Sequence, residues 1–419
     1  MRPKEEWRVD MVWERDWFLG LVSGALLRLG YLGTVYGGFP KYRYLKLGIP
    51  AEKIRTKPGA SLWNYGIDRM RLPMGLRMDE PKRIGNWVAQ QRKLAPAVLV
   101  NGTAYRFLFP QIMRRPILRL VERGSMFPED FFRFPQKARQ EAGYPFLEDL
   151  PSEIVDEMEK ARLAEATICG SEMIRDSYAR RGFPAEALHT VHYGVDPRRF
   201  SPATHEPAEG RNLRVGWLGV IGFRKGLDRV RKISEWADQR GIPIEFHFVG
   251  PIQDPESIKI LHRFRRPYTL HGVKKGEALR ELIPQWDLYL LPSYEEGFPV
   301  SVLEAMSAGI PAIVSNDTGA REAVLKDEGG VVLSTFAHEE LDRRLLPLCQ
   351  NRNLRIQKGQ EAKERIGNHL RGKSIRRSWV AFTKLFKFER GWPEAEIGLE
   401  GALRTDCSPQ KSVRPKESE

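Results

Sequence analysis

Apolar residues along the chain are concentrated in short runs, and polar stretches containing glycine and proline separate these runs. A short run that is apolar throughout predicts a strand covered on both faces, as in a parallel sheet flanked by helices. In the second half of the chain such runs lie at 213–218, 244–249, 268–271, 287–291, 311–315 and 330–333. The first half has runs at 7–13, 33–36, 97–100, 113–121 and 166–169, and an apolar helix is expected at 16–30. This alternation predicts an α/β protein built from doubly wound sheets.

The length of the chain and one polar segment divide it into two parts. A chain of 419 residues is long for a single hydrophobic core, so two domains are expected. The polar segment contains Pro207 and Gly210, which is typical of a linker. The expected organisation is a first domain at 1–203, the linker at 204–212, a second domain at 213–373, a helix bearing Trp and Phe at 374–390, and a disordered polar tail at 391–419.

Residues 293–311, SYEEGFPVSVLEAMSAGIP, predict a loop and a short helix between two buried strands. Pro299 suits the first helical position, because its φ is fixed and its missing N–H costs nothing there. Gly309 and Pro311 provide the end of the helix. Strand, loop, helix and strand form a right-handed crossover unit, and ligands bind outside the carboxyl ends of such strands.

Two glutamates of this segment are expected at one ligand site. Glu296, with Glu295 beside it, lies in the loop at the strand end, and Glu304 follows eight positions later. Glu304 would lie about a turn and a half into the helix, with its side chain leaning back toward the helix start. A helix N-terminus carries partial positive charge and free N–H donors, so the site suits an anion.

A glycine-rich segment, GVIGFRKG at 219–226, follows the strand at 213–218 and precedes a helix. Glycines allow a backbone to approach a diphosphate closely. Arg224 and Lys225 would neutralise the negative charge that grows on a leaving phosphate. The alternative interpretation is a tight turn with two surface cations.

Together these two segments resemble the retaining glycosyltransferases of family 4 (glycosyl transferases group 1), which have the GT-B fold. Glu296 and Glu304 match the Glu-x7-Glu signature of that family. Gly219 and Lys225 match its Gly-Arg…Lys-Gly element, except that Val220 stands where the family usually has arginine. The neighbouring Arg224 is the residue available to supply the missing cation.

The resemblance implies two Rossmann-like doubly wound domains facing a cleft, with catalytic roles for Lys225 and Glu296. The first glutamate would lie at the sugar or its diphosphate, and the second at the ribose hydroxyls of the nucleotide. The donor-binding residues that it implies are Gly219, Arg224, Lys225, Val273, Glu296, Gly297, Phe298, Val300, Ser301 and Glu304. The reaction would be retaining transfer from a nucleotide-diphosphate sugar to an acceptor hydroxyl of a cell-envelope, exopolysaccharide or lipid-linked glycan precursor.

The first domain would hold the acceptor. Its ERGS sequence resembles a Glu/Asp-Arg-Gly-Ser passage of some bacterial family members, so Glu122, Arg123 and Ser125 are expected on the acceptor side. The family generally places a histidine in this domain near the reaction centre, whereas here the first histidine of the chain is His189. His189 and His192 lie near the end of the domain and are interpreted as structural.

The sequence offers no obvious metal site. Metal-dependent transferases use an Asp-x-Asp pair after a strand, and no such pair follows a predicted strand here. We therefore expect activity without a cofactor or metal ion, with Lys225 and the helix N-terminus in place of a divalent cation. Cys169, Cys349 and Cys407 are far apart and lack metal-ligand spacing, which fits a reducing cytoplasm.

The net charge is +14, and it is unevenly distributed. Residues 351–390 hold 12 Lys/Arg against three Asp/Glu, and the first 205 residues hold 33 against 24. This balance fits anionic partners such as nucleotide-sugar phosphates or an anionic membrane surface, although charge that merely keeps the protein soluble is the alternative. Nucleic acid is not an expected partner, because no nucleic-acid-binding module is evident. The apolar stretch at 17–27 is too short to span a bilayer, so we expect a cytoplasmic protein, peripheral at the inner face of the membrane.

Two other classes of function stay open at this point. One is another GT-B enzyme, such as a phosphorylase-like or sugar-phosphate synthase relative. The other is a non-catalytic relative that binds a nucleotide sugar or a protein partner, which Val220 and the missing histidine of the first domain favour.

Overall fold

The computed structural model describes residues 8–14, 19–70, 74–195, 200, 202, 211–324 and 328–368. The predicted helix at 374–390 and the predicted tail at 391–419 lie outside these residues, as do all but the last two residues of the predicted linker.

The first half of the chain forms a parallel sheet of seven strands within the described residues, with the order β3-β2-β1-β4-β5-β6-β7. The strands are β1 (Val9–Trp13), β2 (Leu32–Gly37), β3 (Ile54–Thr56), β4 (Ala97–Asn101), β5 (Leu118–Arg123), β6 (Ala166–Cys169) and β7 (Leu188–Thr190). The α-helices are α1 (Leu19–Arg28), α2 (Lys41–Leu45), α3 (Gly59–Met70), α4 (Glu80–Ala89), α5 (Tyr105–Ile112), α6 (Pro128–Glu141), α7 (Ser152–Ala161) and α8 (Glu172–Ala179).

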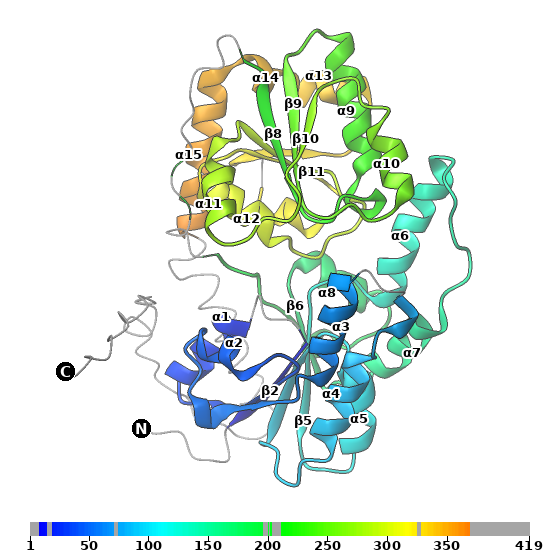
Figure 1. Ribbon diagram of the computed structural model, residues 1–419, viewed down its shortest axis with the longest axis vertical. Coiled ribbons are helices and arrows are strands. Elements are labelled where there is room, and N and C mark those ends of the chain that lie inside the picture. The colour runs from blue at the N-terminus through cyan, green and yellow to red at the C-terminus, as the bar shows by residue number, and fades with distance from the viewer. Residues whose placement is uncertain are drawn as a thin grey trace, which may run out of the picture.

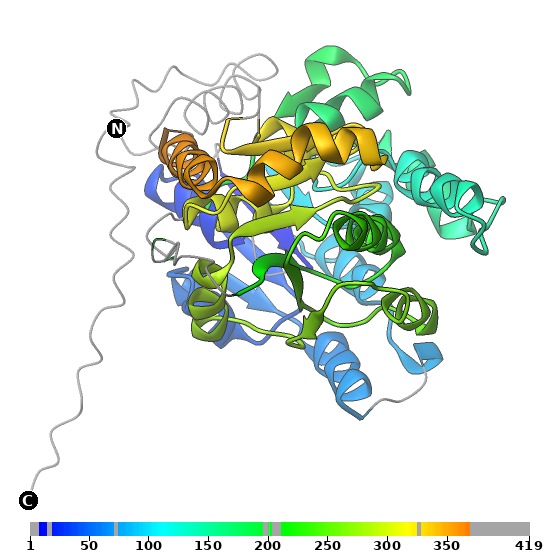
Figure 2. The same ribbon diagram turned by 90° about the horizontal axis from the view of Figure 1, so that it is seen from above.

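The second half forms a parallel six-stranded sheet with the order β10-β9-β8-β11-β12-β13 among the described residues. Its strands are β8 (Leu213–Leu218), β9 (Ile244–Val249), β10 (Tyr268–Leu270), β11 (Leu288–Leu291), β12 (Ala312–Ser315) and β13 (Gly330–Leu333). The α-helices are α9 (Leu227–Gln239), α10 (Pro255–Leu261), α11 (Glu277–Leu282), α12 (Val300–Ser307), α13 (His338–Arg344), α14 (Leu346–Gln350) and α15 (Arg352–Asn368). In Figure 1 this domain lies above the first, and Figure 2 shows its helices on both faces of its sheet.

Continuous apolar strands arise because each sheet is covered on both faces. In β11, Leu288 and Leu290 pack with one buried cluster, whereas Tyr289 and Leu291 pack with another on the opposite face. Successive side chains of a strand point to opposite faces, so a strand covered on both faces must be apolar at every position.

The predicted elements agree with the structure, with three differences in detail. The run at 113–121 forms a strand only from Leu118, where β5 begins. The edge strands β3 and β7, three residues each, were not predicted because they are too short to carry a hydrophobic pattern. The prediction that Pro299 is the first helical residue is wrong. Its ψ of 115° is extended, so Pro299 is the residue before α12 and Val300 begins the helix. Gly309, with φ of +83°, follows α12 as predicted for a helix end.

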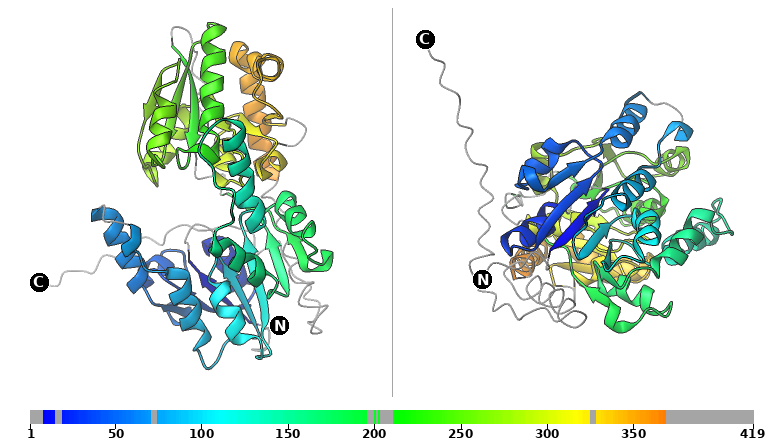
Figure 3. Two further views of the ribbon diagram at one scale, coloured as in Figure 1. Left: turned by 90° about the vertical axis from the view of Figure 1, so that its right-hand side faces the viewer. Right: turned by 90° about the horizontal axis from the view of Figure 1, so that it is seen from below.

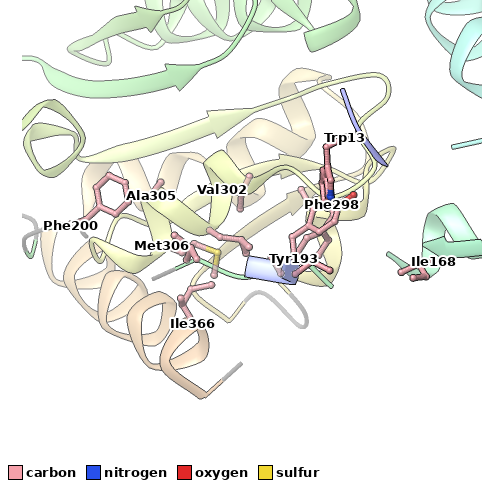
Figure 4. Close-up of a cluster of buried hydrophobic side chains, with 14 of the residues drawn as sticks. Trp13, Ile168, Tyr193, Phe200, Phe298, Val302, Ala305, Met306 and Ile366 are labelled. Carbon is pink, nitrogen blue, oxygen red and sulfur yellow. The ribbon is translucent and has the colours of Figure 1, made fainter. Parts of the chain in front are cut away.

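One buried hydrophobic cluster runs from the first domain into the second. Trp13 and Tyr193 of the first half and Phe298 of the second half belong to it, and Figure 4 shows these three side chains gathered together. The same cluster continues along α12 through Val302 and Met306. The two domains are therefore in direct apolar contact near the loop that precedes α12.

Candidate functional site

In both sheets the strand order reverses beside the first strand of the domain, between β1 and β4 and between β8 and β11. Such a reversal leaves a crevice at the carboxyl ends of the two strands, where ligands of doubly wound proteins bind. Gly219 directly follows β8, and the loop that contains Glu296 follows β11. The two motifs predicted to bind a ligand therefore lie on the two sides of one switch point.

The backbone after β8, β9 and β10 is closely packed at this end of the sheet. Gly219 donates its N–H to the carbonyl oxygen of Val249 at 2.9 Å, and Gly250 donates to Gly272, also at 2.9 Å. All three glycines have positive φ, and a Cβ on Gly219 would lie 2.8 Å from Cε of Lys225. Glycine at 219 therefore makes room for the Lys225 side chain. Val273 follows Gly272 and is 59% exposed, so the structure places it at the outer end of this row of loops.

Four charged side chains meet beside Gly219. The Nζ of Lys225 lies 2.6 Å from Oε1 of Glu296, and Nη1 of Arg224 lies 3.0 Å from the same oxygen. Arg224 also pairs with Oε2 of Glu295 at 3.0 Å and donates to the backbone carbonyl of Glu295 at 2.7 Å. Arg224 therefore contacts both carboxylates of the acidic loop. Two cations and two carboxylates form one cluster at the switch point.

The two neighbouring carboxylates have opposite pKa shifts. Burial raises the pKa of Glu295 to about 7, the Glu296 carboxylate pushes it further up, and Arg224 offsets these effects in part. Burial also acts to raise the pKa of Glu296, but Lys225 and Arg224 outweigh it, so that pKa lies below its usual value. Glu296 is therefore ionised at neutral pH, while Glu295 changes its charge near neutrality.

The helix after this loop supplies the remaining predicted donor residues. Val300 and Ser301 form the first turn of α12, and the Ser301 hydroxyl accepts a hydrogen bond from Tyr289 at 2.8 Å. Burial raises the pKa of Tyr289, and both Glu304 and Glu296 raise it further, so both carboxylates act on one phenol. Glu304 lies about one turn after Val300 on the same helix.

The first domain meets the site through the segment after β5. A Cβ on Gly297 would overlap the carbonyl oxygen of Gly124, so the loops after β5 and β11 touch backbone to backbone. The N–H of Met126 points at Oε1 of Glu295, 3.4 Å away. Ser125, between these contacts, is half-buried. The predicted acceptor segment therefore lies directly against the predicted donor loop.

Glu122 and Arg123 point into the first domain instead of toward a substrate. Glu122 is buried and accepts hydrogen bonds from Asn101 and Tyr193, and burial raises its pKa. Arg123 is buried too and pairs with Glu157 at 2.6 Å. Glu122 and Arg123 are the last two residues of β5, directly before the loop that carries Ser125. Their buried contacts therefore hold the start of that loop in place.

A second contact between the domains involves a histidine that sequence reasoning treated as structural. The His192 ring stacks on Phe298 with 4.9 Å between ring centroids, and its Nε2 lies 2.8 Å from Oε2 of Glu322. The Glu322 carboxylate also accepts the N–H groups of Glu172 and Met173 at the start of α8, at 2.9 and 3.0 Å. Glu322 belongs to the second domain and the other polar partners to the first. We call His192, Phe298 and Glu322 the interdomain latch.

A third contact joins α6 to the glycine-rich segment. Arg139 of α6 pairs with Glu256 of α10 at 2.5 Å, and its guanidinium lies 5.1 Å from the ring centre of Phe223. Phe131, on the same helix, lies beneath the guanidinium of Arg224 at 5.6 Å. Figure 1 shows α6 rising from the first domain toward α10. The loop with Arg224 and Lys225 is therefore braced from the first domain.

Sequence reasoning did not predict the contacts that Glu295, His192 and Glu322 make between the domains. Glu295 carried a signal, since it precedes Glu296 in the same loop, but its contact with Arg224 spans 71 residues. His192 and Glu322 are 130 residues apart and carry no shared motif.

The described residues contain neither a candidate metal cluster nor a candidate membrane-spanning helix. Histidine, cysteine and carboxylate side chains in this part of the chain do not form groups of three or more that suit a metal ion. Each helix in the same part of the chain is too short or too polar to cross a membrane.

The fold is similar to that of solved structures, and part of the sequence matches a known family. The crystal structure of HepE from Anabaena in complex with UDP-glucose superposes with a TM-score of 0.62 and 15% identity, over 91% of this chain and 99% of that one. The chain has the GT-B fold. Residues 215–365 of this GT-B chain match the family model "Glycosyl transferases group 1". That range contains Gly219, Lys225, Glu296 and Glu304.

Curated relatives match parts of the chain. A putative colanic acid biosynthesis glycosyltransferase of Escherichia coli, WcaL, is 25% identical over 190 residues, which is 42% of this chain and 47% of the relative. A Campylobacter jejuni protein named N,N'-diacetylbacillosaminyl-diphospho-undecaprenol alpha-1,3-N-acetylgalactosaminyltransferase is 36% identical over 127 residues, 30% of this chain and 34% of the relative. The chain thus spans about half the length, or less, of these relatives.

Proposed function

We propose that this GT-B protein is a retaining glycosyltransferase of family 4 that transfers a sugar from a nucleotide-diphosphate sugar to an acceptor hydroxyl. The observation that carries the proposal is the contact of Lys225 and Arg224 with Glu296 at the switch point, beside the first turn of α12. Two cations and a helix N-terminus together suit a diphosphate, and the carboxylates suit hydroxyl groups.

The charged cluster has a defined task during bond cleavage. As the sugar–phosphate bond breaks, negative charge grows on the diphosphate, and Lys225 with Arg224 would stabilise it in a largely buried place. The electron pair of that bond leaves with the diphosphate, and the sugar becomes oxocarbenium-like. The acceptor hydroxyl then attacks from the same face, and the leaving phosphate takes its proton. Glu304 would bind the ribose, and Glu296 the sugar or diphosphate.

The acceptor would lie at the loop after β5. Ser125 and the backbone from Gly124 to Met126 face the donor loop, which supports an acceptor role for this segment. Glu122 and Arg123 would act indirectly, by holding the loop, since their side chains are buried with partners inside the first domain.

We further propose a cell-envelope, exopolysaccharide or lipid-linked glycan precursor as acceptor, and a cytoplasmic protein that contacts an anionic membrane. The names of the two relatives support this, one referring to colanic acid biosynthesis and the other to a diphospho-undecaprenol acceptor. The net charge of +14 agrees with an anionic surface as partner.

Nucleotide release tests the proposal and separates it from a non-catalytic role. The protein is incubated with UDP-, GDP- and ADP-sugars, and free nucleotide is measured with and without added glycan acceptors. We expect slow hydrolysis of one donor, accelerated by an acceptor. Tight donor binding with no release for any pair would instead favour a non-catalytic nucleotide-sugar-binding protein, in line with Val220 at the usual arginine position.

A further inference from the structure

Helix α3 exposes an apolar face to solvent. Ala60, Ser61, Asn64 and Ile67 are buried on one side of the helix. On the opposite side Leu62, Trp63, Tyr65 and Met70 are 49% to 64% exposed. A surface helix normally turns polar residues to water, so packing among the described residues does not account for this distribution. Figure 3 shows α3 (blue) projecting from the first domain.

The apolar surface extends beyond the helix. The Trp63 indole donates its N–H to the carbonyl oxygen of Leu76 at 2.9 Å, and Leu76 is itself 51% exposed. We define the aromatic face as Leu62, Trp63, Tyr65, Met70 and Leu76. Of the 17 large hydrophobic side chains exposed in the described chain, eight lie between residues 42 and 76. Exposed apolar side chains are therefore concentrated in this part of the described chain.

Basic residues surround the aromatic face. Residues 41–83 contain 11 Lys/Arg and four Asp/Glu, an excess of seven positive charges. Lys57, Arg69, Arg77, Lys82 and Arg83 are all exposed. A second copy of the chain docked on this surface would bring like charges together, which opposes self-association. A polyanionic partner with an apolar interior is favoured instead.

We infer that the aromatic face docks the protein on the surface of an anionic bilayer. Trp and Tyr side chains are enriched at membrane–water interfaces, since one end of each is apolar and the other polar. Leu62 and Met70 enter the boundary between headgroups and acyl chains, and the surrounding cations contact the headgroups. The apolar side chains and the surrounding cations are both needed, because a single kind of membrane contact gives only weak, reversible binding.

Docking through α3 places a bilayer beside the acceptor side of the site. The Ser61 hydroxyl at the start of α3 hydrogen-bonds Glu80 next to Gly38, which directly follows β2. The carboxyl ends of the strands in this sheet face the second domain, as the contact of Gly124 with Gly297 shows. A lipid-linked acceptor would thus reach the site from the docked membrane; this statement rests on the proposed function, whereas the docking itself does not.

Co-sedimentation with vesicles tests the inference on the full chain. Phosphatidylcholine vesicles with and without phosphatidylglycerol are used at low salt. We expect binding to the anionic vesicles, a fall of about tenfold in partition coefficient for the Leu62→Gln/Trp63→Gln double variant, and a similar fall for Lys57→Gln/Arg69→Gln. The control is Met113→Gln/Leu147→Gln, which changes two side chains of similar exposure outside the aromatic face and should bind as the original protein does. Thermal melting checks that all variants fold.

Three results would overturn docking through α3. They are no binding to either vesicle type, unchanged binding by the Leu62→Gln/Trp63→Gln variant, and self-association that this variant abolishes. Nucleotide release in solution is measured in parallel. A protein that releases nucleotide without binding vesicles contradicts the docking and the proposed membrane contact, but not the proposed sugar transfer. One that binds vesicles through α3 without releasing nucleotide contradicts the proposed sugar transfer alone.

Discussion

Lys225 and Glu296 come from loops on the two sides of a strand reversal, and each is the nearest counter-charge of the other at 2.6 Å. In the proposed donor complex, Lys225 would exchange this carboxylate for phosphate oxygens and so remain paired. Gly219 keeps the path of the lysine side chain open. The donor proposal therefore depends most heavily on Lys225.

Lys225→Ala should lower turnover about 100-fold while leaving the fold intact, as expected for loss of one group that stabilises developing charge. The measurement is the rate of nucleotide release at saturating donor. Lys232→Ala, an exposed lysine on the following helix, serves as the matched control and should keep its rate. A near-normal rate for Lys225→Ala would remove the lysine from the mechanism.

Glu295 predicts a pH dependence of donor binding. Burial raises the pKa of Glu295 to about 7, so the side chain is neutral in acid and becomes a carboxylate as the pH rises through that value. Its charge then competes with phosphate for Arg224, and affinity for a nucleotide sugar should fall about fivefold between about pH 6 and about pH 8. Calorimetric titration measures this, and Glu295→Gln should flatten the profile. An equal slope in that variant would assign the effect to another group.

Some of these residues were predictable, and others were not. That Lys225 and Glu296 lie at one switch point could be predicted, because both follow strand ends. The burial of Glu122 and Arg123 could not, since it depends on Tyr193 and Glu157, which reach them through the fold of the domain. A motif gives the position of a residue along a strand, but not the direction of its side chain.

Loops and short helices carry the contacts between the domains. The loops after β5 and β11 touch at Gly124 and Gly297, and η8 (Gly319–Glu322) brings Glu322 to the start of α8. Strand positions in the second domain were predicted almost to the residue, because hydrophobic runs define them. The latch was not predictable, because its polar partners belong to different domains and are brought together only by the three-dimensional fold.

Glu322→Gln should weaken the latch. The carboxylate accepts two backbone N–H groups and pairs with His192, so its loss should cost about 2 kcal/mol of stability at neutral pH. Burial acts to raise the pKa of Glu322, but these hydrogen bonds outweigh it and the pKa lies below its usual value. The stabilisation is thus present above the unfolded-state pKa and is lost as the pH falls through the folded-state value.

Thermal melts at several pH values measure this difference. The original protein should lose its advantage over Glu322→Gln as the pH falls below about 4. Glu328→Gln, which removes an exposed partner of Arg365, is the control and should change little at any pH. A difference between the original protein and Glu322→Gln that stays constant into acid would mean that the carboxylate charge is not what stabilises the contact.

At the scale of the whole molecule, two parallel sheets present the carboxyl ends of their strands to each other. Apolar runs and the alternation of strands with helices were enough to predict two doubly wound halves. The bracing of Arg224 by Phe131 was not predictable, because α6 crosses from one domain to the other. Figures 1 and 3 show the two domains stacked along the long axis of the molecule.

The arrangement predicts turnover without added metal. In the proposed donor site, Lys225, Arg224 and the α12 N-terminus would neutralise the diphosphate in place of a divalent cation. Nucleotide release should therefore be unchanged after treatment with EDTA and removal of the chelator. Loss of activity, restored by a divalent cation, would show that these groups are insufficient.

A crystal structure with the nucleotide sugar that the release assay identifies tests the proposed donor site most directly. We expect the diphosphate between Lys225 and the first turn of α12, the ribose hydroxyls at Glu304, and the sugar beside Glu296 and the loop after β5. A donor bound elsewhere on the chain, or a diphosphate at this place that contacts neither Lys225 nor Arg224, would contradict it.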